Sequence, residues 1–178
     1  TLFRSNGLTY DPLDEIIVTV GATEGIFLSM MALLDPGDEV LIFSPSFPAY
    51  AQCANMIEAI PVFVPLKQDN DFEPIIEDLK SKITSKTKMI VINTPHNPTG
   101  AVYSEKMLTA LAQIAIENDL LVLSDEIYEK NIYDGYKHFS IASLPGMQER
   151  TITLNGFFKN HCMTGWRLGY LASSRELI

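Results

Sequence analysis

The chain has 178 residues, of which 47% are hydrophobic and 20% are charged, a composition that predicts one soluble domain with a sizeable core. Its 13 basic and 22 acidic residues give a formal net charge of −9 without a basic block or an acidic tail, so nucleic acid and anionic membranes are poor candidate partners. Two cysteines, Cys53 and Cys162, match no metal-ligand spacing, so we expect no metal site, no disulfide framework and a reducing, cytoplasmic location.

Short β-rich segments alternate with helical patterns along the chain, which favours a parallel sheet covered by helices on both faces. The most apolar stretch, 16–34, is interrupted by Glu24 and two glycines, so it predicts no membrane span. We therefore expect an α/β fold with three layers, α/β/α, and a mostly parallel sheet. The expected strands are 16–20, 39–43, 61–65, 89–92, 120–123, 151–154 and 168–172. The expected helices are 22–34, a segment after Pro48, 73–82, one that Ser104 begins as N-cap, and the start of another at 173–178.

Residues directly after strands are the first place to look for a site, because ligands of open α/β sheets bind at the carboxyl ends of the strands. The first strand is followed by Gly21-Ala22-Thr23-Glu24, which predicts an anion site at a helix N-terminus. A plain glycine turn with a capping threonine would use the same residues. After the second strand, Phe47 stands between two prolines and is either a core residue or a ring that stacks on a flat ligand.

Polar and charged residues follow the later strands as well. Asn97 lies in the loop 93–100, where two prolines and a glycine present it as a hydrogen-bonding group or simply form a turn. Asp125 ends a buried strand, and a carboxylate there needs a cationic or proton-donating partner. Lys159 and Arg167 lie in the glycine-bearing stretch 155–170 without a nearby carboxylate, which suggests an anion between them.

The three histidines show no metal-ligand spacing. We interpret His96, His138 and His161 as surface or loop residues rather than catalytic bases.

Five motifs in this order resemble the class I and II aminotransferases, and the resemblance covers nearly the whole chain. They are Gly-Ala-Thr-Glu at 21–24, Pro-Ser-Phe-Pro-Ala-Tyr at 45–50, Asn-Thr-Pro-His-Asn-Pro-Thr-Gly at 93–100, Ser-Asp-Glu-Ile-Tyr at 124–128, and Lys159 followed by Gly-Trp-Arg-Leu-Gly-Tyr at 165–170. The resemblance implies a fold type I enzyme that depends on pyridoxal 5′-phosphate (PLP). Such an enzyme moves an amino group between an amino acid and a 2-oxo acid and is usually a homodimer.

The resemblance also implies a role for each matching residue at the reactive and phosphate ends of the cofactor. Lys159 matches the lysine that holds PLP as a Schiff base and moves protons during the reaction. Arg167 matches the arginine that grips the phosphate through two hydrogen bonds. The amides of Ala22 and Thr23, with the Thr23 hydroxyl, match the rest of the phosphate cradle.

Four further matches concern the pyridine ring. Phe47 falls where an aromatic ring stacks on the pyridine. Asp125 matches the carboxylate that keeps the pyridine nitrogen protonated, so that the ring acts as an electron sink. Tyr128 and Asn97 match the residues that hydrogen-bond the 3′ oxygen. The resemblance thus implies Lys159, Asp125 and Tyr128 as catalytic residues.

The sequence departs from the family pattern in two ways. Phe158 precedes the lysine where the family usually has a small residue, often Ser; its ring either shifts the phosphate site or points into the core. We also expect 1–178 to be an incomplete PLP-binding large domain, without the N-terminal segment and the C-terminal small domain that carries the arginine for the substrate carboxylate. Two alternatives therefore stay open: a truncated, non-catalytic module that binds PLP or a subunit, and another fold type I activity such as a carbon–sulfur lyase.

Overall fold

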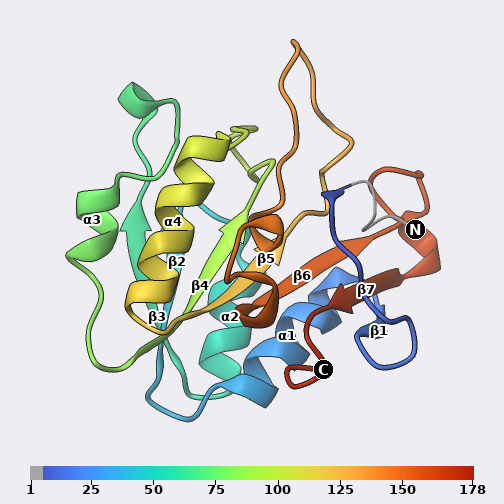
Figure 1. Ribbon diagram of the computed structural model, residues 1–178, viewed down its shortest axis with the longest axis horizontal. Coiled ribbons are helices and arrows are strands. Elements are labelled where there is room, and N and C mark those ends of the chain that lie inside the picture. Colours follow the sequence, from blue (N-terminus) through green and yellow to red (C-terminus); the bar gives the residue numbers. More distant parts are fainter. Residues whose placement is uncertain (1–5) are drawn as a thin grey trace.

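The computed structural model describes residues 6–178, which form one seven-stranded sheet with the strand order β1-β7-β6-β5-β4-β2-β3 (Figure 1). The strands are β1 (Ile16–Val20), β2 (Glu39–Ser44), β3 (Ile60–Pro65), β4 (Thr87–Asn93), β5 (Leu121–Asp125), β6 (Thr151–Gly156) and β7 (Leu168–Ala172). The α-helices are α1 (Ala22–Leu33), α2 (Ala49–Met56), α3 (Ile76–Lys80) and α4 (Glu105–Glu117). Short 3₁₀ turns are η2 (Gln68–Asn70), η3 (Ile141–Ser143), η4 (Gln148–Arg150) and η5 (Thr164–Trp166).

The sheet is mostly parallel, as the sequence predicts. Strands β3, β2, β4, β5 and β6 run parallel to one another. β7 is antiparallel to both of its neighbours, β6 and β1. The carboxyl ends of β2, β4, β5 and β6 therefore meet at one edge of the sheet, which is the edge where side chains from different loops can converge.

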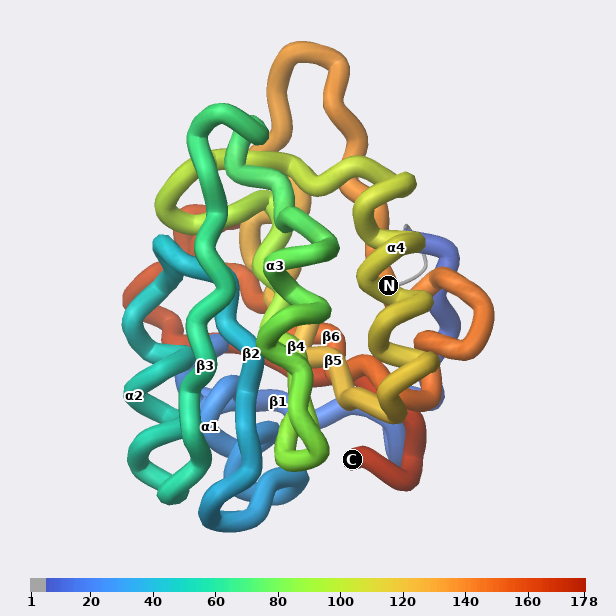
Figure 2. The backbone as a smooth tube through the Cα atoms, turned by 90° about the vertical axis from the view of Figure 1, so that its left-hand side faces the viewer, coloured from blue at the N-terminus to red at the C-terminus, as the bar shows by residue number. Residues whose placement is uncertain are grey.

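Helices cover both faces of the sheet, so the three expected layers are present. α1 and α2 pack on one face through a buried cluster that includes Ile26, Met30 and Cys53. α3 and α4 pack on the other face through a second cluster that includes Leu79 and Leu108. Figure 2 shows the two pairs of helices on opposite sides of the central strands. Alternate residues of β2 and β4 enter the two clusters, as the two-residue period of a strand requires.

Local signals decide where the helices begin. Ser104 is the N-cap of α4, as expected, and its hydroxyl accepts a 3.2 Å hydrogen bond from the Met107 amide. α3 is shorter than the predicted 73–82, because Pro74 disfavours helical backbone at Glu73, and the helix starts only at Ile76. Residues 173–178 form a turn and not the expected helix start. Within the described residues no helix combines the length and apolar character needed to cross a bilayer.

Candidate functional site

A cavity of about 210 Å³ lies at the carboxyl ends of the parallel strands. All eight residues to which the family resemblance assigns a binding or catalytic role line it: Ala22, Thr23, Phe47, Asn97, Asp125, Tyr128, Lys159 and Arg167. They come from six separate segments, because each parallel strand ends at this edge of the sheet. Ile26, Tyr50, Asn93, Ile127, Phe158 and Thr164 complete the lining.

Part of the cavity lining carries positive potential at the N-terminus of α1. Gly21 precedes α1 with φ 78° and ψ 165°, a backbone conformation that favours glycine, and no side chain caps the helix N-terminus. A Cβ atom at Gly21 would lie 2.4 Å from Arg167 Nη2, so the missing side chain lets the guanidinium approach the helix start. Two sources of positive potential, the α1 amides and Arg167, therefore meet at this point.

The two cations of the cavity have no acidic partner within the described residues. The ion pairs there join other residues and leave Lys159 and Arg167 out. The Lys159 ammonium lies 5.5 Å from the centre of the Tyr128 ring, and both cationic side chains are exposed. An anionic ligand would supply the negative charge that the protein does not place beside them.

The cavity lining also includes a buried carboxylate. Asp125 is only 4% exposed and accepts hydrogen bonds from the Tyr50 hydroxyl at 2.7 Å and the Ile127 amide at 3.1 Å. Burial raises the pKa of Asp125 to about 6, although both hydrogen bonds act to lower it. The sequence predicted that this carboxylate needs a cationic or proton-donating partner, and the Tyr50 phenol is that donor. A protonated pyridine nitrogen would be a second one.

The loop after β4 is ordered by hydrogen bonds from buried polar groups. The Asn93 side chain donates to the Asp125 carbonyl at 3.0 Å and accepts a 2.7 Å hydrogen bond from the Asn97 amide. His96 contacts Thr99 at 2.8 Å, and burial lowers the pKa of its imidazole to about 4, so the ring is neutral near pH 7. His96 is thus a buried loop histidine, and Asn93 is the residue that fixes Asn97 beside the cavity.

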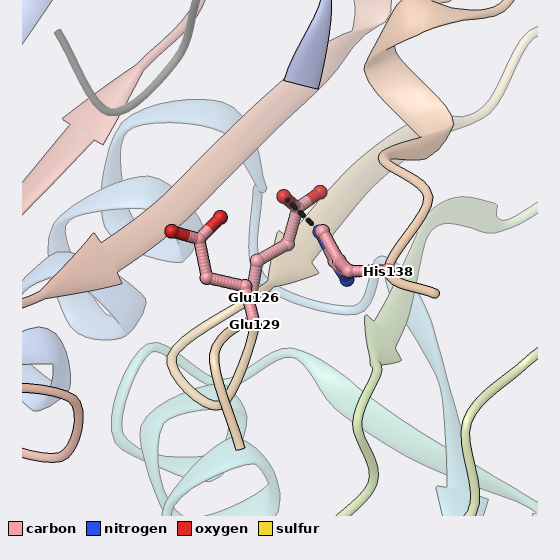
Figure 3. A group of neighbouring side chains, drawn as sticks. All are labelled: Glu126, Glu129 and His138. Atoms are coloured by element: carbon pink, nitrogen blue, oxygen red, sulfur yellow. Dashed lines mark hydrogen bonds and ion pairs between the residues drawn. The ribbon is translucent and has the colours of Figure 1, made fainter. Parts of the chain in front are cut away.

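A second polar network lies beside β5 (Figure 3). Glu126 accepts hydrogen bonds from Ser124 at 3.0 Å and Ser140 at 2.7 Å, and its other carboxylate oxygen lies 2.9 Å from His138 Nε2. Ligand atoms of Glu126, Glu129 and His138 all lie within 4.8 Å of one another, a grouping that the sequence spacing did not indicate. Glu129 has its own partners, the Asn6 amide and the Lys130 ammonium. Both carboxylates therefore already have polar protein partners.

His138 lies in a loop, one of the two settings expected for it, and its side chain is only 7% exposed. By contrast, His161 is exposed, as expected.

The comparisons with known proteins agree with this geometry. The family model described as "Aminotransferase class I and II" matches residues 1–178. The chain belongs to the class I and II aminotransferases. It is 48% identical to the aromatic-amino-acid aminotransferase 2 of Thermococcus litoralis, over 98% of this chain and 45% of that protein. It is also 48% identical to the aspartate aminotransferase of Pyrococcus abyssi, over 99% of this chain and 46% of that protein.

Solved structures of this family have the same fold. The aromatic aminotransferase from Pyrococcus horikoshii OT3 superposes with a TM-score of 0.97 at 45% identity, over 99% of this chain and 47% of that one. The chain thus spans somewhat less than half the length of the aminotransferases that it matches. The α/β fold and the membership of the aminotransferase family, both expected from the sequence, are confirmed.

Sequence reasoning gave no role to two residues that line the cavity and contact Asp125, Tyr50 and Asn93. Both stand inside the motifs that carry the resemblance, so the motifs gave the signal. What was missing was the spatial relation: neither residue's contact with Asp125 can be read before the strand order is known.

Proposed function

We propose that this chain is the PLP-binding part of an aminotransferase that moves an amino group between an amino acid and a 2-oxo acid, with Lys159 as the residue that binds the cofactor covalently. One observation carries the proposal: the Lys159 amine, the Asp125 carboxylate and the Arg167 guanidinium line the same cavity. An aldehyde carbon, a pyridine nitrogen and a phosphate are the groups that these three side chains would bind.

The residues present fit PLP on the chemistry of the donor set. Arg167, the Ala22 and Thr23 amides and the Thr23 hydroxyl would hold the phosphate at the α1 N-terminus. Asp125 is buried without a cation beside it, and a pyridinium nitrogen would provide that cation. When bound, PLP supplies an electron sink for the charge that develops when the substrate Cα loses its proton.

The ring of the cofactor would be held by side chains from three segments: the one that precedes α2, the loop after β4 and the loop after β5. Phe47 lines the cavity next to Tyr50, with the two ring centres 5.8 Å apart and the rings nearly perpendicular. This leaves a face of Phe47 for stacking on the pyridine. Tyr128 and Asn97 would donate hydrogen bonds to the 3′ oxygen, and Asn93 holds Asn97 in place for that contact.

Lys159 would act as the general base. Its side chain is exposed to the cavity and has no acidic partner in the described part of the chain, so its amine can reach a ligand. With a substrate in the site, the Lys159 amine would take the proton from the substrate Cα as general base and later give it back as general acid. PLP would supply the carrier for the amino group between release of the first 2-oxo acid and arrival of the second.

The assembly and location follow the same proposal. We infer a cytoplasmic homodimer that acts on small amino acids and 2-oxo acids. Exposed apolar side chains at Val18, Val20 and Trp166 support self-association, since they are 68%, 63% and 75% exposed in the single chain. The free thiols of Cys53 and Cys162 support a reducing compartment.

Cofactor capture tests the proposal. We expect the purified protein to develop a visible absorption band with PLP and, after borohydride reduction, to carry the added mass on the peptide that contains Lys159. Lys159→Ala should lose both signals, and Lys86→Ala, which removes another exposed lysine, should keep them. A band that survives Lys159→Ala unchanged would refute the assignment. An assay with an aspartate or aromatic donor and a 2-oxo acid then tests amino-group transfer.

A further inference from the structure

Phe158 lines the cavity, and the sequence left open whether its ring shifts the phosphate site or points into the core. Its ring lines the cavity and also packs against the apolar cluster under α1. A Cβ atom at Gly156 would lie 2.7 Å from Phe158 Cε1, so the ring rests directly on the glycine at the end of β6. The ring is therefore held by packing against Gly156 and the apolar cluster, and it also borders the cavity.

The Phe158 ring also contacts Arg167. The guanidinium carbon of Arg167 lies 5.8 Å from the centre of the Phe158 ring, within the range of a cation–π interaction. Arg167 Nη2 lies close to Gly21, where an added Cβ would approach it to 2.4 Å. The guanidinium thus stands between an aromatic ring and the turn that opens α1.

Such a contact matters because Arg167 has few other restraints. Its side chain is exposed, and it forms no ion pair within the described residues. A long, freely rotating arginine loses conformational entropy when it binds an anion. A ring that already favours the bound orientation reduces that loss.

We infer that Phe158 is a positioning residue: it holds the Arg167 guanidinium at the α1 N-terminus, ready for the phosphate of the ligand. The inference rests on the proposed function, since it assigns Phe158 to the phosphate end of the same site. A cation–π contact at an exposed site corresponds to a factor of about two to five in affinity. Only ligands that carry the phosphate should show this factor.

Comparing PLP with pyridoxal, which lacks the phosphate, isolates this role. We expect Phe158→Leu to weaken PLP binding to the cofactor-free protein about two- to fivefold and to leave pyridoxal binding unchanged. Phe158→Tyr keeps an aromatic ring and should keep both affinities. The pyridoxal titration also reports whether Phe158→Leu still folds around Lys159. If that variant captures neither aldehyde, Phe158→Met serves in its place, because it retains the packing volume.

A double-mutant cycle with Arg167→Gln shows whether the effect acts through the guanidinium. In the Arg167→Gln background, Phe158→Leu should cause no further loss of PLP affinity. The inference would be overturned if Phe158→Leu weakened PLP and pyridoxal binding equally, or if it weakened PLP binding as much in the Arg167→Gln background as in the unmodified protein. Either result would leave the proposed function standing. Failure of both aldehydes to form any Lys159-dependent adduct with the unmodified protein would overturn both.

Discussion

The hydroxyl of Tyr50 lies 2.7 Å from Oδ2 of Asp125 and donates a hydrogen bond to it. The two residues are 2% and 4% exposed, so the bond joins helix α2 to the end of β5 inside the protein. A hydrogen bond to a charged group in such surroundings contributes more than one at the surface. It stabilises the ionised form of a carboxyl group that burial otherwise disfavours.

Tyr50→Phe should therefore destabilise the protein in a way that depends on pH. At pH 8, where Asp125 is ionised, we expect the free energy of unfolding of the cofactor-free protein to fall by about 1–3 kcal/mol. At pH 5 the loss should be smaller, because most Asp125 carboxyls are then protonated. Urea unfolding at the two pH values measures the difference. An equal loss at both would mean that the bond does not distinguish the two forms of Asp125.

The raised pKa of Asp125 predicts a second pH effect. The folded-state pKa is about 6 and the ordinary value 3.8, so the folded state holds more protons between these values, and its stability falls as pH rises through this window. The loss amounts to about 3 kcal/mol. The side chain of the Asp125→Asn variant cannot titrate. The free energy of unfolding of this variant should therefore rise relative to that of the unmodified protein by up to this amount between pH 4 and pH 7.5. Asp69→Asn, at an exposed position, is the matched control.

Gly169 and Gly165 lie in one segment, but only Gly169 packs against the turn that opens α1, so alanine substitutions at the two positions test that contact. A Cβ atom at Gly169 would lie 2.6 Å from the Gly21 carbonyl carbon and 2.8 Å from the Ala22 nitrogen, whereas one at Gly165 would meet nothing within 4 Å. We expect Gly169→Ala to cost about 1–3 kcal/mol in unfolding free energy and to weaken PLP binding, because the turn must move. Gly165→Ala should change the free energy of unfolding by less than about 0.5 kcal/mol. Similar values for the two variants would contradict this view of the turn.

The Glu126 network predicts a large stability effect. Glu126→Ala removes the acceptor of Ser124 and Ser140 and leaves His138 without its carboxylate, all in the interior. We expect a loss of about 3 kcal/mol or more and faster amide hydrogen exchange in the loop 127–137, which carries Tyr128. Arg175→Ala breaks an exposed pair with Asp14 and should cost less than about 1 kcal/mol. Denaturant unfolding of both variants makes the comparison.

The sequence predicted the strands well where one signal dominates. β4 and β5 are short apolar runs buried on both faces, and α4 has both a cap and a regular apolar spacing. It predicted α3 less well, because the amphipathic pattern starts at residue 73 whereas Pro74 disfavours helical backbone at the residue before it. The antiparallel direction of β7 and its place between β6 and β1 could not be predicted, since they depend on pairing between residues far apart in the chain.

The same limit applies to the site. Strand-end residues and motifs were enough to select the eight residues that share the cavity. The donor for Asp125 was required by physical chemistry, but its identity as Tyr50 depends on α2 lying across the end of β5. The contact between Phe158 and Arg167 likewise follows from the path of the loop between β6 and β7, which no local pattern describes. Their roles in binding a cofactor stay predictions.

The pairing of β1 with β7 has a consequence for synthesis of the protein on the ribosome. β1 is the first strand of the described chain to be made, yet its hydrogen-bonding partner is the last, β7. Until residue 172 has left the exit tunnel, β1 lacks that partner, and the glycine turn after it lacks Gly169, which packs against it. Closing so long a loop is slow. Cofactor capture by the nascent chain should therefore begin only after β7 has emerged.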